Sequence, residues 1–305
     1  IRDRYFIGEI PFEDVFIYAT ILAKDGSRMS KSKGNGVDPM DLIAMYGADA
    51  MRFNLLTLVT NNQDVKFDAN IDKKTHELVD SPRTEAARSF VTKIWNAARF
   101  VMLNMDGYEP GEPQAATAAD AWILSRLAKL TASVTAGIEE YRFGDVAREL
   151  YAFFWNEFCD WYIELAKIRM NGADEESADS ARRVLVWTMS NTLKLLHPFM
   201  PYITEEIWQT LPHDGEALIV AKWPEYDEAL SFPQEAKNLE NVMALIRAIR
   251  TRRNEMNVPP SKKAHIYIDT AHPAPYEEAS EFIARLAYGS KVEIGTGFDV
   301  QGAVT

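Results

Sequence analysis

The middle of the chain, from about residue 81 to residue 212, repeats apolar residues every three or four positions. This spacing places them along one face of an α-helix, and five such stripes follow one another. Amphipathic helices joined by short breaks pack as an antiparallel bundle. The stripes extend over residues 90–105, 123–138, 146–165, 184–196 and 201–208.

The amino-terminal segment mixes strand and helix patterns. Residues 15–18 form a β-branched and aromatic run that is typical of a buried strand. Asp38 followed by Pro39 predicts the capped start of a short helix, and Gly47 predicts its end. A second short helix is expected over about 48–59.

The carboxy-terminal part alternates helix and strand patterns after a loop rich in proline and glycine. A basic amphipathic helix is expected at about 236–256, since apolar residues recur on one side of it. Strands are expected at 265–268 and 291–294, with a helix at 277–288 between them. These elements predict a small α/β unit.

Composition limits the class of protein. Hydrophobic residues make up 47% and charged residues 26% of the 305-residue chain, which is typical of a soluble globular protein with more than one core. No apolar run approaches the ~18 residues of a membrane span. The single cysteine, Cys159, lies in an aromatic stripe, is assigned to packing, and fits a reducing cytoplasm. No Cys/His cluster has metal-ligand spacing. Because the chain opens with Ile1 instead of Met, we expect a piece of a longer protein.

The charge is strongly acidic overall but locally basic. A net charge of −12 argues at first against a nucleic-acid partner, although binding needs only a local basic face. Residues 237–263 carry seven Lys or Arg side chains and only two carboxylates, Glu240 and Glu255.

A basic loop at residues 28–35 is the most specific feature of the chain. It follows an apolar run and a turn, and reads Arg-Met-Ser-Lys-Ser-Lys-Gly-Asn. Such cations suit a polyphosphate, because they neutralise the charge that develops as pyrophosphate leaves. A solvated surface turn is the alternative. A generic nucleotide hydrolase does not fit, because Gly34 follows the lysines instead of preceding a Gly-Lys-Ser/Thr cradle.

The loop resembles the Lys-Met-Ser-Lys-Ser signature of class I aminoacyl-tRNA synthetases. Two further segments resemble the same family: Tyr-Gly-Ala-Asp-Ala-Met-Arg-Phe at 46–53 and Lys-Ile-Trp-Asn-Ala-Ala-Arg-Phe at 93–100. Residues 155–164, 197–208 and 252–260 are most similar to the valine-specific branch. The isoleucine and leucine branches are alternatives, as is a stand-alone, non-catalytic tRNA-binding module.

The resemblance implies a mainly α fold. Residues 1–75 would be the end of the α/β nucleotide-binding fold with its stem-contact helices, residues 76–225 the antiparallel anticodon-binding bundle, and residues 226–305 a small, truncated α/β unit. The family's His-Ile-Gly-His element, editing domain and coiled-coil arm have no counterpart here. We therefore expect the chain to be inactive alone and to be part of a longer, monomeric, cytoplasmic enzyme.

The resemblance also implies a reaction and its site. The family forms an aminoacyl-adenylate from ATP, with Mg²⁺, and transfers the acyl group to tRNA, here valine and its tRNA. Lys31 matches the second signature lysine, which stabilises charge on the phosphates, and Arg28 stands at the first. Arginine keeps the charge but presents a planar fork. Ser30 and Ser32 would donate hydrogen bonds or shape the turn, and Met29 and Lys33 complete the expected ATP site. No metal site is expected in this segment itself.

Two sets of residues are candidates for tRNA contact. By their position in the first bundle helix, Asn96, Arg99 and Phe100 resemble the set that related synthetases turn toward the anticodon. In the alternative interpretation, Phe100 completes the core and Asn96 caps a buried contact. The arginines of the basic helix (Arg247, Arg250 and Arg253) could follow phosphates, or they could form a solvated helix face.

Overall fold

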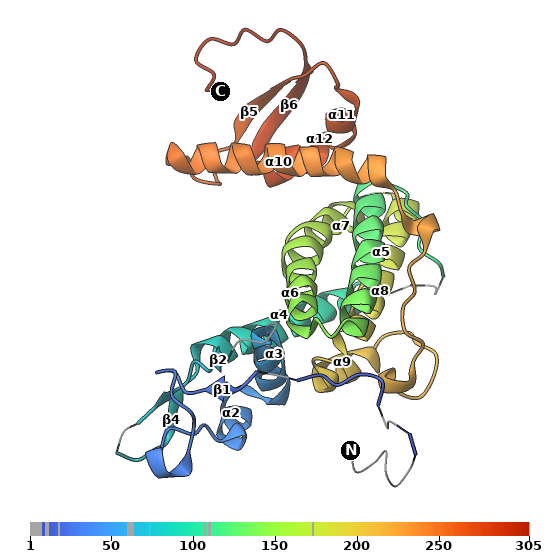
Figure 1. Cartoon of the computed structure of the whole chain (residues 1–305). Helices are drawn as coiled ribbons and strands as arrows, with labels where there is room; N and C mark the ends of the chain where they lie inside the picture. The colour runs from blue at the N-terminus through green and yellow to red at the C-terminus, as the bar shows by residue number, and fades with distance from the viewer. Residues whose placement is uncertain are drawn as a thin grey trace. The chain divides into compact units, whose positions relative to one another are not determined.

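The computed structural model describes residues 8–9, 12–17, 19–59, 64–72, 74–106, 108, 111–172 and 174–304, with the backbone but not the side chain of Lys31. The fold is mainly helical, as the sequence predicts, and its described strands form three two-stranded sheets (Figure 1). The chain divides into two compact units. The first comprises residues 1–100, 130–155 and 191–224, and the second comprises residues 101–129, 156–190 and 225–305. The three-part division expected from the sequence stays a prediction.

The first unit opens with short strands and two short helices. β1 (Ile21–Leu22) pairs in parallel with β2 (Val65–Lys66), and β3 (Asn70–Ile71) pairs antiparallel with β4 (Leu78–Asp80). Helices α2 (Pro39–Tyr46) and α3 (Ala48–Leu58) confirm the two predicted helices. The Asp38 side chain accepts a hydrogen bond from the Met40 N–H at 2.8 Å, and Gly47 ends α2 with a φ of 91°.

The prediction of a strand at residues 15–18 is wrong for residues 15–17, which the structure describes. Val15, Phe16 and Ile17 belong to no strand and are 71%, 43% and 76% exposed; Tyr18 lies outside the described residues. A β-branched run becomes a strand only when a neighbouring strand pairs with it, and none of the described strands does. Instead, the Phe16 ring stacks on Tyr141 with centroids 5.6 Å apart.

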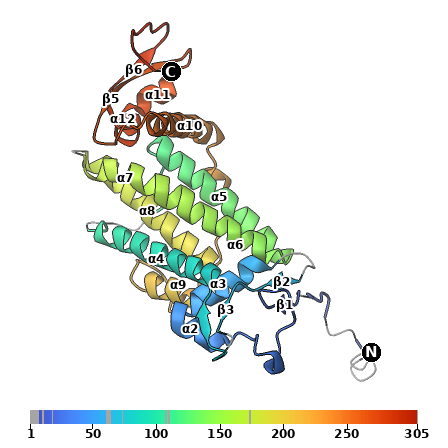
Figure 2. The ribbon, with the colours of Figure 1, turned by 90° about the vertical axis from the view of Figure 1, so that its left-hand side faces the viewer.

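Long helices fill the middle of the chain and confirm the predicted stripes. Their bounds are α4 (Pro82–Leu103), α5 (Ala118–Glu139), α6 (Phe143–Ala152), α7 (Ile163–Met170), α8 (Glu175–Leu196) and α9 (Pro201–Trp208). Residues of α5 and α8 belong to both units. Within the first unit, α4 and α6 lie side by side (Figure 2), and the Phe90 ring lies 4.8 Å from Tyr151 and 5.9 Å from Phe154. No helix in the described part of the chain combines the length and apolar character that crossing a bilayer requires.

The third predicted helix contains a wider turn that its apolar spacing does not reveal. Between α6 and α7 lies a π-helical segment, η2 (Phe153–Tyr162). Its hydrogen bonds connect residues five apart, so each turn holds extra residues while the chain stays helical. Cys159 lies in this segment and is buried, as expected for a packing residue.

A close backbone approach and a buried carboxylate fix the position of α3 in the first unit. A Cβ on Gly144, at the start of α6, would lie 2.0 Å from the Val59 carbonyl oxygen, so only glycine allows this approach. The buried carboxylate of Asp49 accepts hydrogen bonds from the Tyr202 and Ile203 N–H groups at 3.2 and 2.6 Å. It thereby satisfies donors at the start of α9, which lack intrahelical partners.

The second unit carries the carboxy-terminal elements. α10 (Pro233–Glu255) precedes β5 (Ala264–Asp269), which pairs in parallel with β6 (Gly289–Gly295). The single helix predicted at 277–288 is wrong in detail: α11 (Ala274–Glu278) and α12 (Ser280–Leu286) are separate helices. Short 3-10 turns η3 (Leu218–Val220), in the first unit, and η4 (Glu228–Leu230), in the second, interrupt the segment before α10.

Candidate functional site

A tight turn presents the basic loop. The Ala23 N–H donates to the Ser27 carbonyl oxygen at 2.9 Å, and the Gly26 N–H donates to the Ala23 carbonyl oxygen at 2.8 Å. Leu22 and Arg28 then pair as an antiparallel bridge. The first residue of the loop, Arg28, therefore lies beside the end of the short β1 strand.

The side chain of Asn35 fixes the path of the loop. Its Oδ1 accepts a hydrogen bond from the Ser30 N–H at 2.9 Å. Its Nδ2 donates to Ser27 Oγ at 2.9 Å and to the Arg28 carbonyl oxygen at 3.2 Å. The residues that point to phosphate binding do not by themselves reveal this organising role of Asn35. Asparagine after glycine in a turn was the available signal.

Gly34 is fixed by its conformation and by His76. Its φ is 59°, in the left-handed region that favours glycine, and a Cβ there would lie 2.2 Å from His76 Nδ1. The same nitrogen lies 3.2 Å from the Gly34 carbonyl oxygen, to which it can donate only as Nδ1–H. No sequence signal connects His76 with the loop.

The charged groups of the loop face solvent where they are described. Arg28 and Lys33 are exposed, Ser32 is exposed, and Met29 and Ser30 are half-buried. The Ser30 and Ser32 hydroxyl oxygens lie 3.3 Å apart. Lys31 begins the 3-10 turn η1 (Lys31–Lys33), and its side chain lies outside the described part of the chain.

Asp25 lies in the turn that precedes the loop, and its carboxylate accepts a hydrogen bond from the Ser27 N–H at 2.9 Å. Hydrogen bonds from Ser27, with a smaller contribution from Lys33, lower the pKa of Asp25 below its usual value. Its negative charge is thus tied into the turn that precedes the loop. Exposed cations and hydroxyls on a constrained backbone can bind an anionic group such as a phosphate.

The second candidate surface lies on α4. Asn96 and Arg99 are exposed, and Phe100 is half-buried. Trp95, which the apolar stripe assigns to the core, is 40% exposed, because it lies on the solvent side of the helix with Asn96 and Arg99. Asn96 therefore caps no buried contact.

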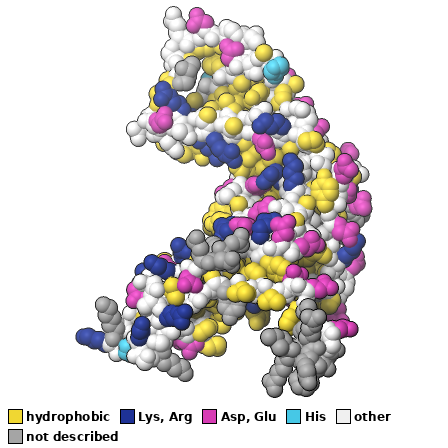
Figure 3. Space-filling view, viewed as in Figure 1, with side chains coloured by type: hydrophobic (Ala, Val, Ile, Leu, Met, Phe, Trp, Pro, Cys, Tyr) yellow, Lys and Arg dark blue, Asp and Glu magenta, His cyan; other side chains and the backbone are white. Residues whose placement is uncertain are grey.

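The arginines of α10 are engaged within the second unit. The Arg247 guanidinium lies 5.0 Å from the Trp161 ring centroid, and Arg250 donates through Nε to the Leu286 carbonyl oxygen at 2.6 Å. Arg253 is 8% exposed and donates to the Pro259 carbonyl oxygen at 3.1 Å. Lys and Arg side chains are visible along α10 in Figure 3. Phosphate binding by these three arginines stays a prediction, and Arg253 is the least accessible of them.

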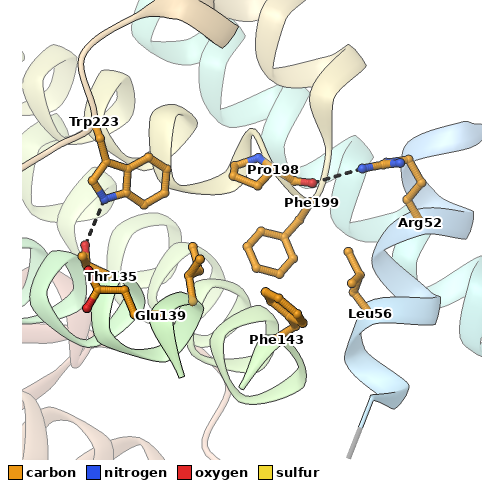
Figure 4. Close-up of a pocket in the computed structure, with 9 residues that line it drawn as sticks. Arg52, Leu56, Thr135, Glu139, Phe143, Pro198, Phe199 and Trp223 are labelled. Carbon is orange, nitrogen blue, oxygen red and sulfur yellow. Dashed lines mark hydrogen bonds between the residues drawn. The ribbon is translucent and has the colours of Figure 1, made fainter. Parts of the chain in front are cut away.

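A mainly apolar pocket of about 440 Å³ lies within the first unit (Figure 4). Two of its polar groups are paired within the chain. Trp223 donates through Nε1 to Thr135 Oγ1 at 2.9 Å, and Arg52 donates to the Pro198 carbonyl oxygen at 3.1 Å. We assign no function to this pocket. The described residues bring no three His, Cys, Asp or Glu side chains together as metal ligands.

Comparison with known proteins identifies the class. Residues 4–68 match the family described as tRNA synthetases class I (I, L, M and V), and residues 120–268 match the anticodon-binding domain of tRNA ligase. The chain belongs to the class I aminoacyl-tRNA synthetases. Within that class it is similar to valine–tRNA ligases over nearly its whole length.

Similar sequences and a similar solved structure both come from aminoacyl-tRNA synthetases. The valine–tRNA ligase of Bacillus licheniformis is 43% identical over 97% of this chain, and that of Geobacillus kaustophilus is 46% identical over 86%. The chain spans only 33% and 29% of these two relatives, about a third of their length. The crystal structure of a leucyl-tRNA synthetase complex from Agrobacterium radiobacter matches 75% of this chain and 26% of the synthetase chain. The TM-score is 0.56 and the sequence identity is 20%, so the two proteins share a fold.

Proposed function

We propose that this chain is the part of a valine–tRNA ligase that supplies the ATP-phosphate loop and the anticodon-binding helices. The longer enzyme would activate valine with ATP and transfer it to the tRNA for valine. The observation that carries this proposal is the 43% identity to a valine–tRNA ligase over 97% of the chain. We propose valine over isoleucine or leucine because the two relatives described above, at 43% and 46% identity, are valine–tRNA ligases.

In this proposal the basic loop acts on ATP. As the valine carboxylate attacks the α-phosphate, pyrophosphate leaves and negative charge develops on its oxygens. Lys31 and Arg28 would stabilise that charge, with Ser30 and Ser32 donating hydrogen bonds and Lys33 adding a cation. The Asn35 hydrogen bonds support the proposal because they constrain the loop before any ligand binds. The Mg²⁺ expected with ATP stays a prediction.

The remaining parts of the proposal concern the tRNA and the assembly. Asn96, Arg99 and Phe100 would contact the anticodon, and the arginines of α10 would lie near tRNA phosphates. Exposure of the first two supports this role, since a recognition group must be accessible. We further propose that the longer enzyme is a cytoplasmic monomer.

A chimera tests the catalytic part of the proposal. Residues 1–305 would replace the matching segment of the Bacillus licheniformis valine–tRNA ligase, and valine-dependent pyrophosphate exchange would be measured. We expect the chimera to be active and Lys31→Ala to lower its exchange rate at least ~100-fold, as for the loss of one electrostatic contact to a developing oxyanion.

The matched control is Lys74→Ala. Lys74 is an exposed lysine of the first unit that lies outside the loop. The control should keep the exchange rate of the unmodified chimera. An active chimera whose rate is the same with Lys31→Ala would remove the role proposed for the loop.

A further inference from the structure

His76 has a strained backbone at the tip of the β3–β4 hairpin. Its φ is 58°, in the left-handed region that residues other than glycine seldom adopt. Hydrogen bonds enforce this turn: Asp72 Oδ1 accepts from the Lys74 and Thr75 N–H groups at 2.7 and 2.9 Å. The His76 N–H donates to the Asp72 carbonyl oxygen at 2.9 Å. Strain of this kind persists only where surrounding contacts fix it, and it gathers at functional sites.

The strained turn brings the imidazole to the end of the basic loop. His76 Nδ1 lies 3.2 Å from the Gly34 carbonyl oxygen, which can only accept, so the hydrogen bond requires a hydrogen on Nδ1. Gly34 has a φ of 59°, so two left-handed residues from distant parts of the chain meet here. The ring therefore contacts the loop at its one glycine, where the backbone would otherwise be freest to move.

The same hairpin contacts the turn before the loop. Lys24 Nζ donates to Asn70 Oδ1 in β3 at 2.8 Å, and it lies 3.1 Å from Asp68 Oδ1. Asn70 in turn donates to Asp80 Oδ1 across the hairpin. The hairpin thus contacts the chain at Lys24 and at Gly34, on both sides of the loop cations. A loop held at both ends has less conformational freedom to lose when a ligand binds.

The core of the first unit does not explain the tip of the hairpin. Residues 74–77, at this tip, are exposed and bury no side chain. Among the described strands, β3 and β4 pair only with each other. The two family matches cover residues 4–68 and 120–268, so neither includes the hairpin. Its contacts with the loop are therefore the feature that calls for a role.

We propose that the β3–β4 hairpin positions the basic loop for the reaction, and that His76 is a positioning residue that acts through Gly34. The inference rests on the proposed function, which assigns the loop to the ATP phosphates. A loop that is ordered before the phosphates arrive holds its cations where charge develops on the departing pyrophosphate. Removing the His76 contact should therefore slow the chemical step and leave valine binding unchanged.

The test compares variants of the chimera described above in valine-dependent pyrophosphate exchange. His76→Gly removes the imidazole but keeps a residue that readily adopts a positive φ, so the turn is retained. We expect kcat to fall ~3- to 10-fold, as for the loss of one hydrogen bond, with an unchanged KM for valine. His76→Asn should recover most of the rate, because asparagine tolerates this conformation and its Nδ2 can donate to the Gly34 carbonyl oxygen.

A double-mutant cycle shows whether His76 acts through the loop. Lys31→Ala removes a cation that the loop is proposed to position, so in that background His76→Gly should lower the rate by less than ~2-fold. A role in folding alone would lower the rate by the same factor in both backgrounds.

The matched control is again Lys74→Ala. Lys74 lies in the same turn as His76, but in the described part of the chain no hydrogen bond or ion pair connects its side chain with the loop. Its kcat should equal that of the unmodified chimera.

The 305-residue chain gives a second readout that needs no catalysis. The Ser30 N–H donates to Asn35 Oδ1, and Asn35 follows Gly34 directly. Loosening Gly34 should therefore speed amide hydrogen exchange at Ser30, by ~3- to 10-fold in His76→Gly and by less in His76→Asn. The melting curve should be the same in all three proteins.

Four results would overturn the inference. The first is an unchanged exchange rate at Ser30 in His76→Gly, which is decisive whether or not the chimera is active. The second is an equal loss of kcat for His76→Gly with and without Lys31→Ala. The third is a His76→Asn variant as slow as His76→Gly. The fourth is an unchanged kcat for His76→Gly in a chimera that Lys31→Ala slows, which leaves the proposed function standing. The proposed function fails separately, if Lys31→Ala does not slow an active chimera.

Discussion

At the scale of single residues, Asn35 shapes the basic loop through three hydrogen bonds. Asn35→Ala should speed amide hydrogen exchange at Ser30 by ~5- to 30-fold, as expected for a local loss of one to two kcal/mol. Exchange followed by NMR measures this. Asn35→Asp keeps the acceptor for the Ser30 N–H and should show a smaller change. Equal exchange rates in all three proteins would mean that other contacts hold the loop.

His197 links stability to pH. Its Nδ1 lies 2.8 Å from Thr204 Oγ1, and its Nε2 is buried without a partner among the described residues. Burial lowers the pKa of His197 below its ordinary 6.5, with Glu205 and Asp49 opposing the shift. The unfolded chain therefore binds a proton more readily than the folded chain, and this site's contribution to stability is lost as pH falls through 6.5 toward the folded-state pKa.

The measurement is urea unfolding of the wild type and of His197→Gln between pH 8 and pH 5. We expect the wild type to lose stability relative to the variant as pH falls, and the difference to be constant above pH ~7.5. A difference that does not change across this range would show that His197 has the same pKa in both states.

At the scale of elements, a buried polar network fixes the start of α5 against its neighbours in the second unit. Asp120 accepts hydrogen bonds from the Tyr162 hydroxyl at 2.7 Å and from Arg169 Nη1 at 2.6 Å. Arg169 also donates to Ser177 Oγ at 2.9 Å. Burial, with the Asp120 charge, raises the pKa of Tyr162 well above its ordinary value, so the hydroxyl remains a donor.

Removing one partner of this network should strongly lower the free energy of unfolding. Asp120→Ala leaves the Arg169 charge buried without its carboxylate, so we expect a loss of ~3–5 kcal/mol in the free energy of unfolding. Urea denaturation measures it. Glu164→Ala breaks the half-exposed pair with Lys167 and should cost under ~1 kcal/mol. Similar losses for the two variants would contradict the account.

The sequence predicted best the elements whose ends are set by residues at those ends. Asp38 and Gly47 determine the ends of α2 through their own backbone and side-chain preferences, and both were recognised. The strand predicted at residues 15–18 was wrong for the described residues 15–17, because a strand depends on a pairing partner elsewhere in the chain. The π-helical segment was not predicted because its apolar residues still recur on one face.

The candidate sites were predictable only in part, for the same reason. The composition of the loop pointed to anion binding, but the bonds from Asn35 and the approach of His76 depend on the folded path. On α10, a charge pattern does not reveal the aromatic rings that engage Arg247 and Arg250. Trp95 fitted an apolar stripe, and only the packing places it at the surface.

At the scale of the whole molecule, an acidic chain is proposed to bind an acidic polymer. With a sequence pI of about 5.0, overall charge opposes association with tRNA, so local cationic surfaces must supply the attraction. Affinity should therefore fall steeply with salt, although the protein and the RNA carry net charges of the same sign. A tRNA affinity that rises or stays constant from 50 to 200 mM salt would contradict this.

The central claim is that this chain recognises the tRNA for valine by its anticodon. The most direct measurement is a titration of residues 1–305, at one fixed salt concentration, with the valine tRNA transcript and with the same transcript carrying a methionine anticodon. We expect the altered anticodon to weaken binding at least ~10-fold, or more than one kcal/mol. Equal affinity for the two transcripts would contradict the account.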